Sequence, residues 1–223
     1  GLMRRAAIAR PLHVVVWVVA LAALAWFAST PTGAEFDLRF ARWIGDLRME
    51  IPDGGVDSLL MGVTEVFRPL FVGPVTLLGA ILLWRRLRAM ALLVPLAFGA
   101  SILMTYAMKA LLDRERPGSA LRLSELPALH DAAFPSAHMA GVTGTGMAVL
   151  QVALPIVGRA VAALLRWAVV ALIAVVGLSR VWVGAHWLTD VAGGLAAGVL
   201  GLILALLILR AAPVRRLAGG GFR

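Results

Sequence analysis

Long apolar runs alternate with short polar segments along this chain, at a spacing typical of membrane helices. The pattern predicts an all-α fold with six membrane helices, over residues 11–28, 57–84, 89–112, 138–158, 160–179 and 187–210. Each run is close to the roughly 20 apolar residues that cross a hydrocarbon core about 30 Å thick, because a helix rises about 1.5 Å per residue. The second run is the least regular of the six, since it contains Glu65, Arg68, Pro69 and Pro74.

The first apolar run has one feature of a secretory signal peptide, because Arg4, Arg5 and Arg10 precede it. The run from Leu12 to Ala28 is about 17 residues long, whereas a signal core usually has 7–15, and no clean small-x-small site follows it. We therefore expect a retained first membrane helix.

Residues 35–50 carry apolar side chains at helical spacing among charged ones. The apolar positions are Phe36, Leu38, Phe40, Trp43, Ile44 and Leu47. Such a pattern predicts an amphipathic helix in the first outer loop, lying on the membrane surface.

Composition supports an integral membrane protein, because 61% of the 223 residues are hydrophobic and only 15% are charged. The absence of cysteine excludes a disulfide framework and a thiolate metal site. A net charge of +9 is also found in nucleic-acid-binding proteins, but here the arginines flank apolar runs. We interpret them as topology signals and contacts to anionic lipids, and we expect no nucleic-acid partner.

Three polar clusters stand at the ends of apolar runs: Lys109 with Arg116-Pro117, then Pro135-Ser136-Ala137-His138, and finally Ser179-Arg180 with His186 and Asp190. From each cluster, about one membrane thickness of helix leads to an arginine beside a polar turn. The spacings are 21 residues for Arg88–Lys109, 21 for His138–Arg159, 21 for Arg159–Arg180 and 24 for His186–Arg210. If the helices alternate in direction, all three clusters meet at one membrane face. Their cations, histidines and serine suit a phosphate group attached to a lipid.

Charge predicts which face this is. If both termini lie on one side, that side holds twelve arginines and no acid, at positions 4, 5, 10, 85, 86, 88, 159, 166, 210, 215, 216 and 223. Lys and Arg concentrate in cytoplasmic segments. We therefore expect cytoplasmic termini in a plasma membrane and the polar clusters on the extracytoplasmic side.

In order and in internal spacing, the three clusters resemble the motifs of the type 2 phosphatidic acid phosphatase (PAP2) superfamily. The resemblance covers about residues 105–190, and with the six-helix layout it implies one integral membrane domain over residues 1–223. Ala137 departs from the pattern, because the family usually has glycine there. Alanine keeps the backbone N–H, although any positive φ at this position would become costly.

The resemblance implies the reacting groups. His186 is expected to attack phosphorus and form a phosphohistidine, and Asp190, one helical turn later, to orient it. His138 is expected to protonate the leaving group and then to activate water.

The resemblance also implies the phosphate-binding groups. Lys109, Arg116 and Arg180 would hold the phosphoryl oxygens, while Ser136 and the backbone N–H of Ala137 would add neutral donors. Neither a metal nor another cofactor is expected, since three cations already balance the phosphate charge.

Other interpretations of the same residues stay open. Lys109 could be a lysine extending to the membrane surface, and His186 with Asp190 could be a structural pair. A metal site is conceivable from His130, Asp131, His138 and His186, although the spacing does not favour zinc. Within the phosphatase interpretation, no role is assigned to His130 or Asp131.

The resemblance therefore implies a metal-independent lipid phosphatase acting at the outer leaflet on a lipid (di)phosphate among membrane lipids. The first expected substrate is a polyprenyl (undecaprenyl or decaprenyl) diphosphate, and the alternative is phosphatidylglycerophosphate or phosphatidate. Two functions of other classes remain: a lipid phosphotransferase, and a non-catalytic lipid-binding or transport protein.

Overall fold

The structure is a computed structural model that describes residues 10–51, 54–124, 126 and 129–211. These residues form eight α-helices and two short 3₁₀ turns, and they contain no strand. The elements are α2 (Pro11–Ala28), α3 (Pro31–Glu50), α4 (Gly54–Val66), α5 (Pro69–Leu87), η2 (Arg88–Leu92), α6 (Leu93–Leu112), η3 (Ser119–Leu121), α7 (Ala137–Ala153), α8 (Arg159–Trp182) and α9 (Leu188–Arg210). The predicted all-α fold is confirmed.

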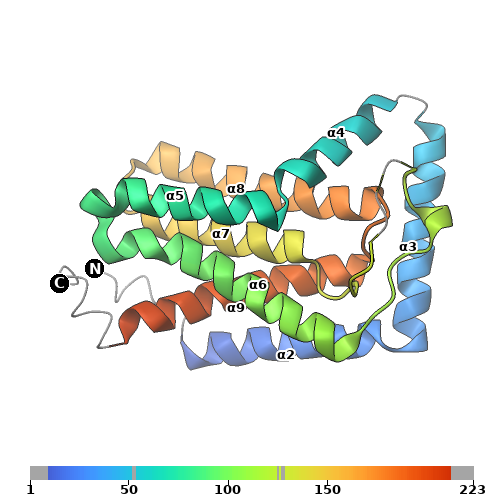
Figure 1. The fold of residues 1–223 in the computed structure, drawn as a ribbon, viewed down its shortest axis with the longest axis horizontal. Helices are drawn as coiled ribbons and strands as arrows, with labels where there is room; N and C mark the ends of the chain where they lie inside the picture. The colour runs from blue at the N-terminus through green and yellow to red at the C-terminus, as the bar shows by residue number, and fades with distance from the viewer. Residues whose placement is uncertain (1–9, 52–53, 125, 127–128, 212–223) are drawn as a thin grey trace.

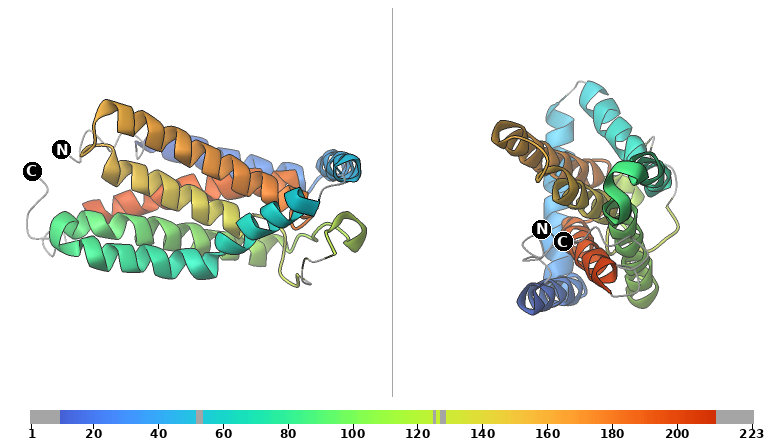
Figure 2. Two further views of the ribbon diagram at one scale, coloured as in Figure 1. Left: turned by 90° about the horizontal axis from the view of Figure 1, so that it is seen from above. Right: turned by 90° about the vertical axis from the view of Figure 1, so that its left-hand side faces the viewer.

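Helix α9 is the centre of the bundle, with α2, α6 and α7 packed around it (Figure 1, Figure 2). Glycines allow this close approach. A Cβ added at Gly198 would lie 2.7 Å from the carbonyl oxygen of Ala140 in α7, and one at Gly201 would lie 2.9 Å from that of Ala97 in α6. No side chain fits at such distances, so α9 lies directly against the backbones of both neighbours.

The outer faces of the bundle are apolar, whereas the buried charges gather at one end. Four stretches of the described residues are long and apolar enough to cross a membrane: Pro11–Ala28, Pro69–Leu112, Arg159–Trp182 and Leu188–Arg210. The longest, Pro69–Leu112, consists of α5 and α6 folded back on each other through η2 (Figure 1). Large apolar side chains such as Leu82 and Trp167 are largely exposed on these helices, as expected of an integral membrane protein in contact with lipid.

The single helix predicted over 57–84 is wrong. Helix α4 ends at Val66 and α5 begins at Pro69, and α4 leans away from the axis of α5 (Figure 1, Figure 2). Proline disfavours a helical backbone in the residue before it, and Arg68 accordingly has φ −57° and ψ 137°. Pro74, in contrast, is accommodated inside α5.

Three other predicted boundaries need correction. The helix predicted over 160–179 is α8, which continues to Trp182. The helix predicted over 138–158 ends at Ala153 because Pro155 follows, and the one predicted over 89–112 begins at Leu93 after the 3₁₀ turn η2. The first helix, 11–28, is confirmed at both ends.

The amphipathic helix predicted over 35–50 is present as α3, which begins earlier, at Pro31. It lies across one end of the bundle (Figure 1, Figure 2). Gly33, Asp37, Ala41 and Ile44 are buried at helical spacing and face the bundle. Of these, Asp37 is the one ionisable side chain, so α3 brings a carboxylate to the covered end of the bundle.

Candidate active site

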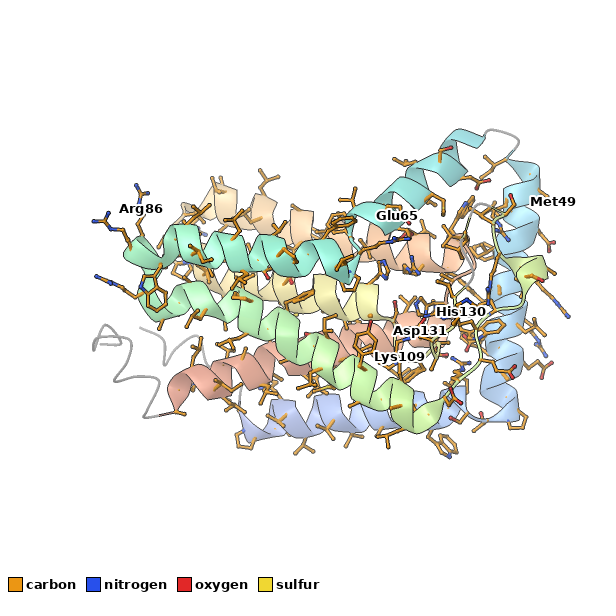
Figure 3. The ribbon with its side chains drawn as sticks, in the orientation of Figure 1. Met49, Glu65, Arg86, Lys109, His130 and Asp131 are labelled. Atoms are coloured by element: carbon orange, nitrogen blue, oxygen red, sulfur yellow. The ribbon has the colours of Figure 1, made fainter. Side chains whose placement is uncertain are left out.

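The three polar clusters meet at the end of the bundle that α3 covers. Lys109 lies in the last turn of α6, His138 in the first turn of α7 and Arg180 in the last turn of α8, while His186 lies two residues before the start of α9. Together with Arg116, Ala137 and other residues they line one cavity of about 350 Å³. Figure 3 shows Lys109 at this end, opposite Arg86. The convergence predicted from helix spacing is therefore confirmed.

The nucleophile candidate His186 is 2% exposed, and its two ring nitrogens face different partners. Nε2 lies 3.2 Å from Nη1 of Arg116. A guanidinium only donates hydrogen bonds, so Nε2 accepts here and the ring proton belongs on Nδ1. Burial first, and then the charges of Arg116 and Arg180, hold the pKa of His186 well below its usual range. The imidazole is consequently neutral at pH 7.

Asp190 lies beside His186 but does not form a hydrogen bond with it in this arrangement. Its Oδ2 is 3.5 Å from His186 Nδ1, which is longer than a hydrogen bond. The same oxygen accepts a hydrogen bond of 2.8 Å from the backbone N–H of Trp187. The carboxylate therefore faces the protonated nitrogen, at a distance that a small movement of the ring would close.

Several buried donors at this end have no hydrogen-bond partner among the described residues. Besides Nδ1 of His186, which faces Asp190, they are Nε and Nη1 of Arg180 and the hydroxyl of Ser136. Arg180 lines the cavity and is 3% exposed, whereas Ser136 is fully buried next to the cavity-lining Ala137. Leaving a buried donor without an acceptor costs about 1–3 kcal/mol, and more for a charged group. Such a set of donors fits an anion.

Helix α7 begins at Ala137, and its first turn borders the cavity. Among the described non-glycine residues, positive φ occurs at Arg88 and Asp113, so Ala137 has an ordinary backbone and its difference from the family glycine causes no strain. The N–H groups of this first turn have no partner within the helix. His138 Nε2 lies 3.2 Å from the carbonyl oxygen of Thr64, which can only accept, so the ring donates there.

Asp131 was missed by the sequence analysis, although it occupies the centre of the cation cluster. Its two oxygens lie 2.9 Å from Nζ of Lys109 and 2.7 Å from Nη2 of Arg116. Lys109 also donates to the carbonyl oxygen of Ala132. Burial alone would raise the pKa of Asp131, but the charges of Lys109 and Arg116 hold it below its usual value. Figure 3 shows Asp131 next to Lys109.

Arg114 and Asp37 were missed as well. Arg114 contacts both Asp37 and Asp190, and none of the three lines the cavity. No motif marks either residue, and their contacts join positions 77 and 76 residues apart.

The alternative metal site does not form. The structure describes His130, Asp131, His138 and His186, and within its described residues no three His, Cys, Asp or Glu side chains gather in an arrangement that could hold a metal ion.

Comparison with known proteins agrees with the resemblance of the three polar clusters to the PAP2 superfamily. Residues 88–213 match the PAP2 superfamily. The phosphatidylglycerophosphatase B of Bacillus subtilis (strain 168) is 29% identical over 152 residues, which cover 65% of this chain and 71% of that protein.

Two solved structures share the fold. The crystal structure of a transmembrane PAP2-type phosphatidylglycerolphosphate phosphatase from Bacillus subtilis matches with a TM-score of 0.73 at 23% identity, over 86% of this chain and 93% of that one. LpxE of Aquifex aeolicus matches with a TM-score of 0.57 at 18% identity, over 76% and 94% of the two chains.

Proposed function

Because the chain belongs to the PAP2 superfamily and is a membrane lipid phosphatase of that family, we propose that it cleaves a lipid (di)phosphate through a phosphohistidine formed on His186, without a metal. The single observation that carries this proposal is the cavity itself. Arg180 has buried donors without partners there, and Lys109 and Arg116 stand on its wall beside a neutral, buried His186. A phosphate would satisfy the donors, balance the charges and lie next to the nucleophile.

The proposed first step breaks the bond between phosphorus and the leaving oxygen. His186 Nε2 donates its lone pair to phosphorus as the leaving oxygen takes a proton from His138, which enters this step as an imidazolium and leaves it as the neutral base of the next step. The imidazole becomes positively charged, and Asp190 stabilises the proton that remains on Nδ1. Arg116, which now donates to Nε2, transfers that donor to a phosphoryl oxygen when substrate binds.

The second step reverses the roles. His138 takes a proton from water as the water oxygen attacks phosphorus, the N–P bond breaks, and inorganic phosphate leaves with His186 restored. Lys109, Arg116 and Arg180, with Ser136 and the first-turn N–H groups of α7, hold the three phosphoryl oxygens through both steps.

A second cavity supplies a place for the lipid tail. It measures about 360 Å³ and is lined almost wholly by apolar side chains of α4, α5, α7 and α8, such as Val66 and Val142, and by Phe67 in the turn between α4 and α5. Thr64, Arg68 and His138 of the phosphate cavity are close neighbours of these residues in sequence. We propose that the headgroup occupies the first cavity while the tail lies along the second.

For the substrate, the proposal has two candidates. A polyprenyl diphosphate fits the charge, because Arg68 joins Lys109, Arg116 and Arg180 on the cavity wall, and Asp131 is the one acid among the described lining residues. Arg68 also pairs with Glu65 over 2.7 Å, outside the lining. Phosphatidylglycerophosphate is the second candidate, since the similar Bacillus protein is named a phosphatidylglycerophosphatase.

We further propose that the chain is one domain with six membrane helices, cytoplasmic termini and an extracytoplasmic site in the plasma membrane. The support is the asymmetry of charge: Arg86 lies at the end of the bundle opposite Lys109 and Asp131 (Figure 3), and α8 and α9 carry Arg159 and Arg210 at the ends remote from the site. Arginines 4, 5, 215, 216 and 223, which contributed to this expectation, lie outside the described residues.

The test is phosphate release by the purified protein from a panel of lipid monophosphates and diphosphates in detergent, with and without EDTA. Release that persists in EDTA and is lost in His186→Ala supports the proposal. Release that EDTA abolishes contradicts the metal-free mechanism, and no release from any lipid contradicts the assigned substrate class. Product analysis with added alcohols separates hydrolysis from phosphotransfer.

A further inference from the structure

A buried charge cluster behind the cavity links α3 to Asp190. Arg114 contacts two carboxylates at once: its Nη2 lies 2.7 Å from Oδ2 of Asp37, and its Nη1 lies 2.5 Å from Oδ1 of Asp190. The exposed fractions of the side chains are 1% for Asp37, 0% for Asp190 and 14% for Arg114. Thr189 completes the cluster, since its backbone N–H donates to Asp37 over 3.1 Å and its hydroxyl donates to the same carboxylate.

The contacts fix the orientation of the Asp190 carboxylate. Oδ1 is held by Arg114, which leaves Oδ2 to face Trp187 N–H and His186 Nδ1. Arg114 itself does not line the phosphate cavity. Its side chain contacts Asp190, and this contact is the most direct link between Arg114 and the reacting groups.

Asp37 in turn fixes Arg114. The guanidinium is a planar fork, and two acceptors on different helices hold it in one orientation more firmly than either alone. It also stands over the ring of Trp187, with its Cζ 5.9 Å from the ring centroid. Without Asp37, Arg114 would keep Asp190 and Thr189 as partners but lose the anchor on α3.

Such a cluster is poorly suited to a purely stabilising role. Two carboxylates share one guanidinium, so the cluster keeps a net negative charge in a buried place. Buried ion pairs often contribute little net stability, because desolvation offsets the attraction, but they do fix geometry.

We infer that Asp37 and Arg114 are positioning residues of the reaction, which hold the Asp190 carboxylate against the proton on Nδ1 of His186. The inference rests on the proposed function of His186. It makes α3 part of the catalytic apparatus, although none of its residues lines the phosphate cavity.

The experiment measures kcat and KM for a lipid phosphate, with the rate of phosphohistidine formation in a single turnover, for Asp37→Asn and Arg114→Lys. Both changes keep the approximate size of the side chain. Asp37→Asn removes one negative charge, and Arg114→Lys removes the planar guanidinium that contacts two carboxylates. Loss of a group that orients a metal-binding histidine typically costs about 10-fold to 100-fold in activity, and we expect a loss of the same order here. We expect kcat and the rate of phosphohistidine formation to fall by such a factor while KM stays within about twofold, as for an interaction that matters only in the transition state.

Arg48→Gln is the matched control. Arg48 also ties α3 to the rest of the chain, through a 3.0 Å hydrogen bond to the carbonyl oxygen of Leu121, but it does not touch Asp190. Its kcat should equal that of the parent. If Asp37→Asn does not fold, Arg114→Lys, which keeps the charge, decides the question.

Three results would overturn the inference in an active parent: unchanged kcat in both variants, a rise in KM with constant kcat, or an equal loss of kcat in Arg48→Gln. The second would place Arg114 in substrate binding, and the third would reduce the cluster to a tether of α3. A parent that releases no phosphate would instead refute the proposed function itself.

Discussion

The carboxylate of Asp131 occupies the position between Lys109 and Arg116 that a substrate phosphate would need. A phosphate bound to both cations must displace it. Replacing Asp131 with Asn removes the competing charge and keeps the size of the side chain. Although Asp131 lines the cavity, its loss should help the site: we expect Asp131→Asn to bind phosphate more tightly than the parent.

The size of the expected gain in phosphate affinity follows from the exposure of Asp131. Asp131 is 49% exposed, so its interactions are partly screened by solvent. Ion pairs at such sites contribute about 0.2–1 kcal/mol each, and Asp131 makes two, so the competition is about 0.4–2 kcal/mol. Since about 1.4 kcal/mol corresponds to a factor of ten, phosphate should bind roughly 2-fold to 30-fold more tightly in Asp131→Asn.

The assay measures inhibition by inorganic phosphate, together with KM for a lipid phosphate, at pH 7 and constant ionic strength. The matched control is Asp113→Asn. It removes an acid from the same loop, but Asp113 is exposed, and its φ of 39° suits asparagine equally well. An inhibition constant that is unchanged or higher in Asp131→Asn would refute the reasoning, because Asp131 would then support phosphate binding or take no part in it. An equal fall of the inhibition constant in Asp113→Asn would mean that the total negative charge of the loop, rather than Asp131 itself, weakens phosphate binding.

Three further predictions concern the same site. Lys109→Ala should lower kcat by about 10²-fold, as loss of one transition-state donor does, and should change the melting temperature little; a fully active variant would mean that Lys109 only extends to the membrane surface. The pKa of His186 is held below its usual value of 6.5, so the imidazole stays neutral as the pH falls. The acid limb of the pH profile of kcat/KM should therefore have its midpoint below pH 6.5. A midpoint at or above that value would contradict the proposed neutral, buried nucleophile. Ala137→Gly should leave kcat within about twofold of the parent and cost at most about 1 kcal/mol of stability, measured by activity and thermal unfolding, whereas a large gain in activity would show that alanine distorts the start of α7.

The positions of the helices could be predicted from the sequence because an apolar run that crosses the membrane must match its thickness and ends at a polar turn. The same rule placed Lys109, His138, Arg180 and His186 at one end. Local chemistry accounts for the errors: Pro69 splits the predicted helix 57–84 into α4 and α5, although the proline itself was visible in the sequence.

The partners of the site could not be predicted in the same way. Asp131 lies in an irregular loop 22 residues after Lys109, and loops carry no periodicity that would indicate direction. Asp37 looked like one of several acids in an amphipathic helix, and its burial depends on how α3 lies across the bundle. These contacts are set by tertiary packing, which a single sequence does not express.

The central claim is that His186 carries the phosphoryl group, and the most direct measurement is to trap it. Parent protein mixed with a lipid carrying a radiolabelled phosphate is quenched within the first turnover under alkaline conditions, which preserve phosphohistidine. The account predicts an acid-labile label on the parent, formed equally in EDTA, and no label on His186→Ala. A label of equal amount on His186→Ala, or rapid turnover by the parent with no label at any time, would contradict it.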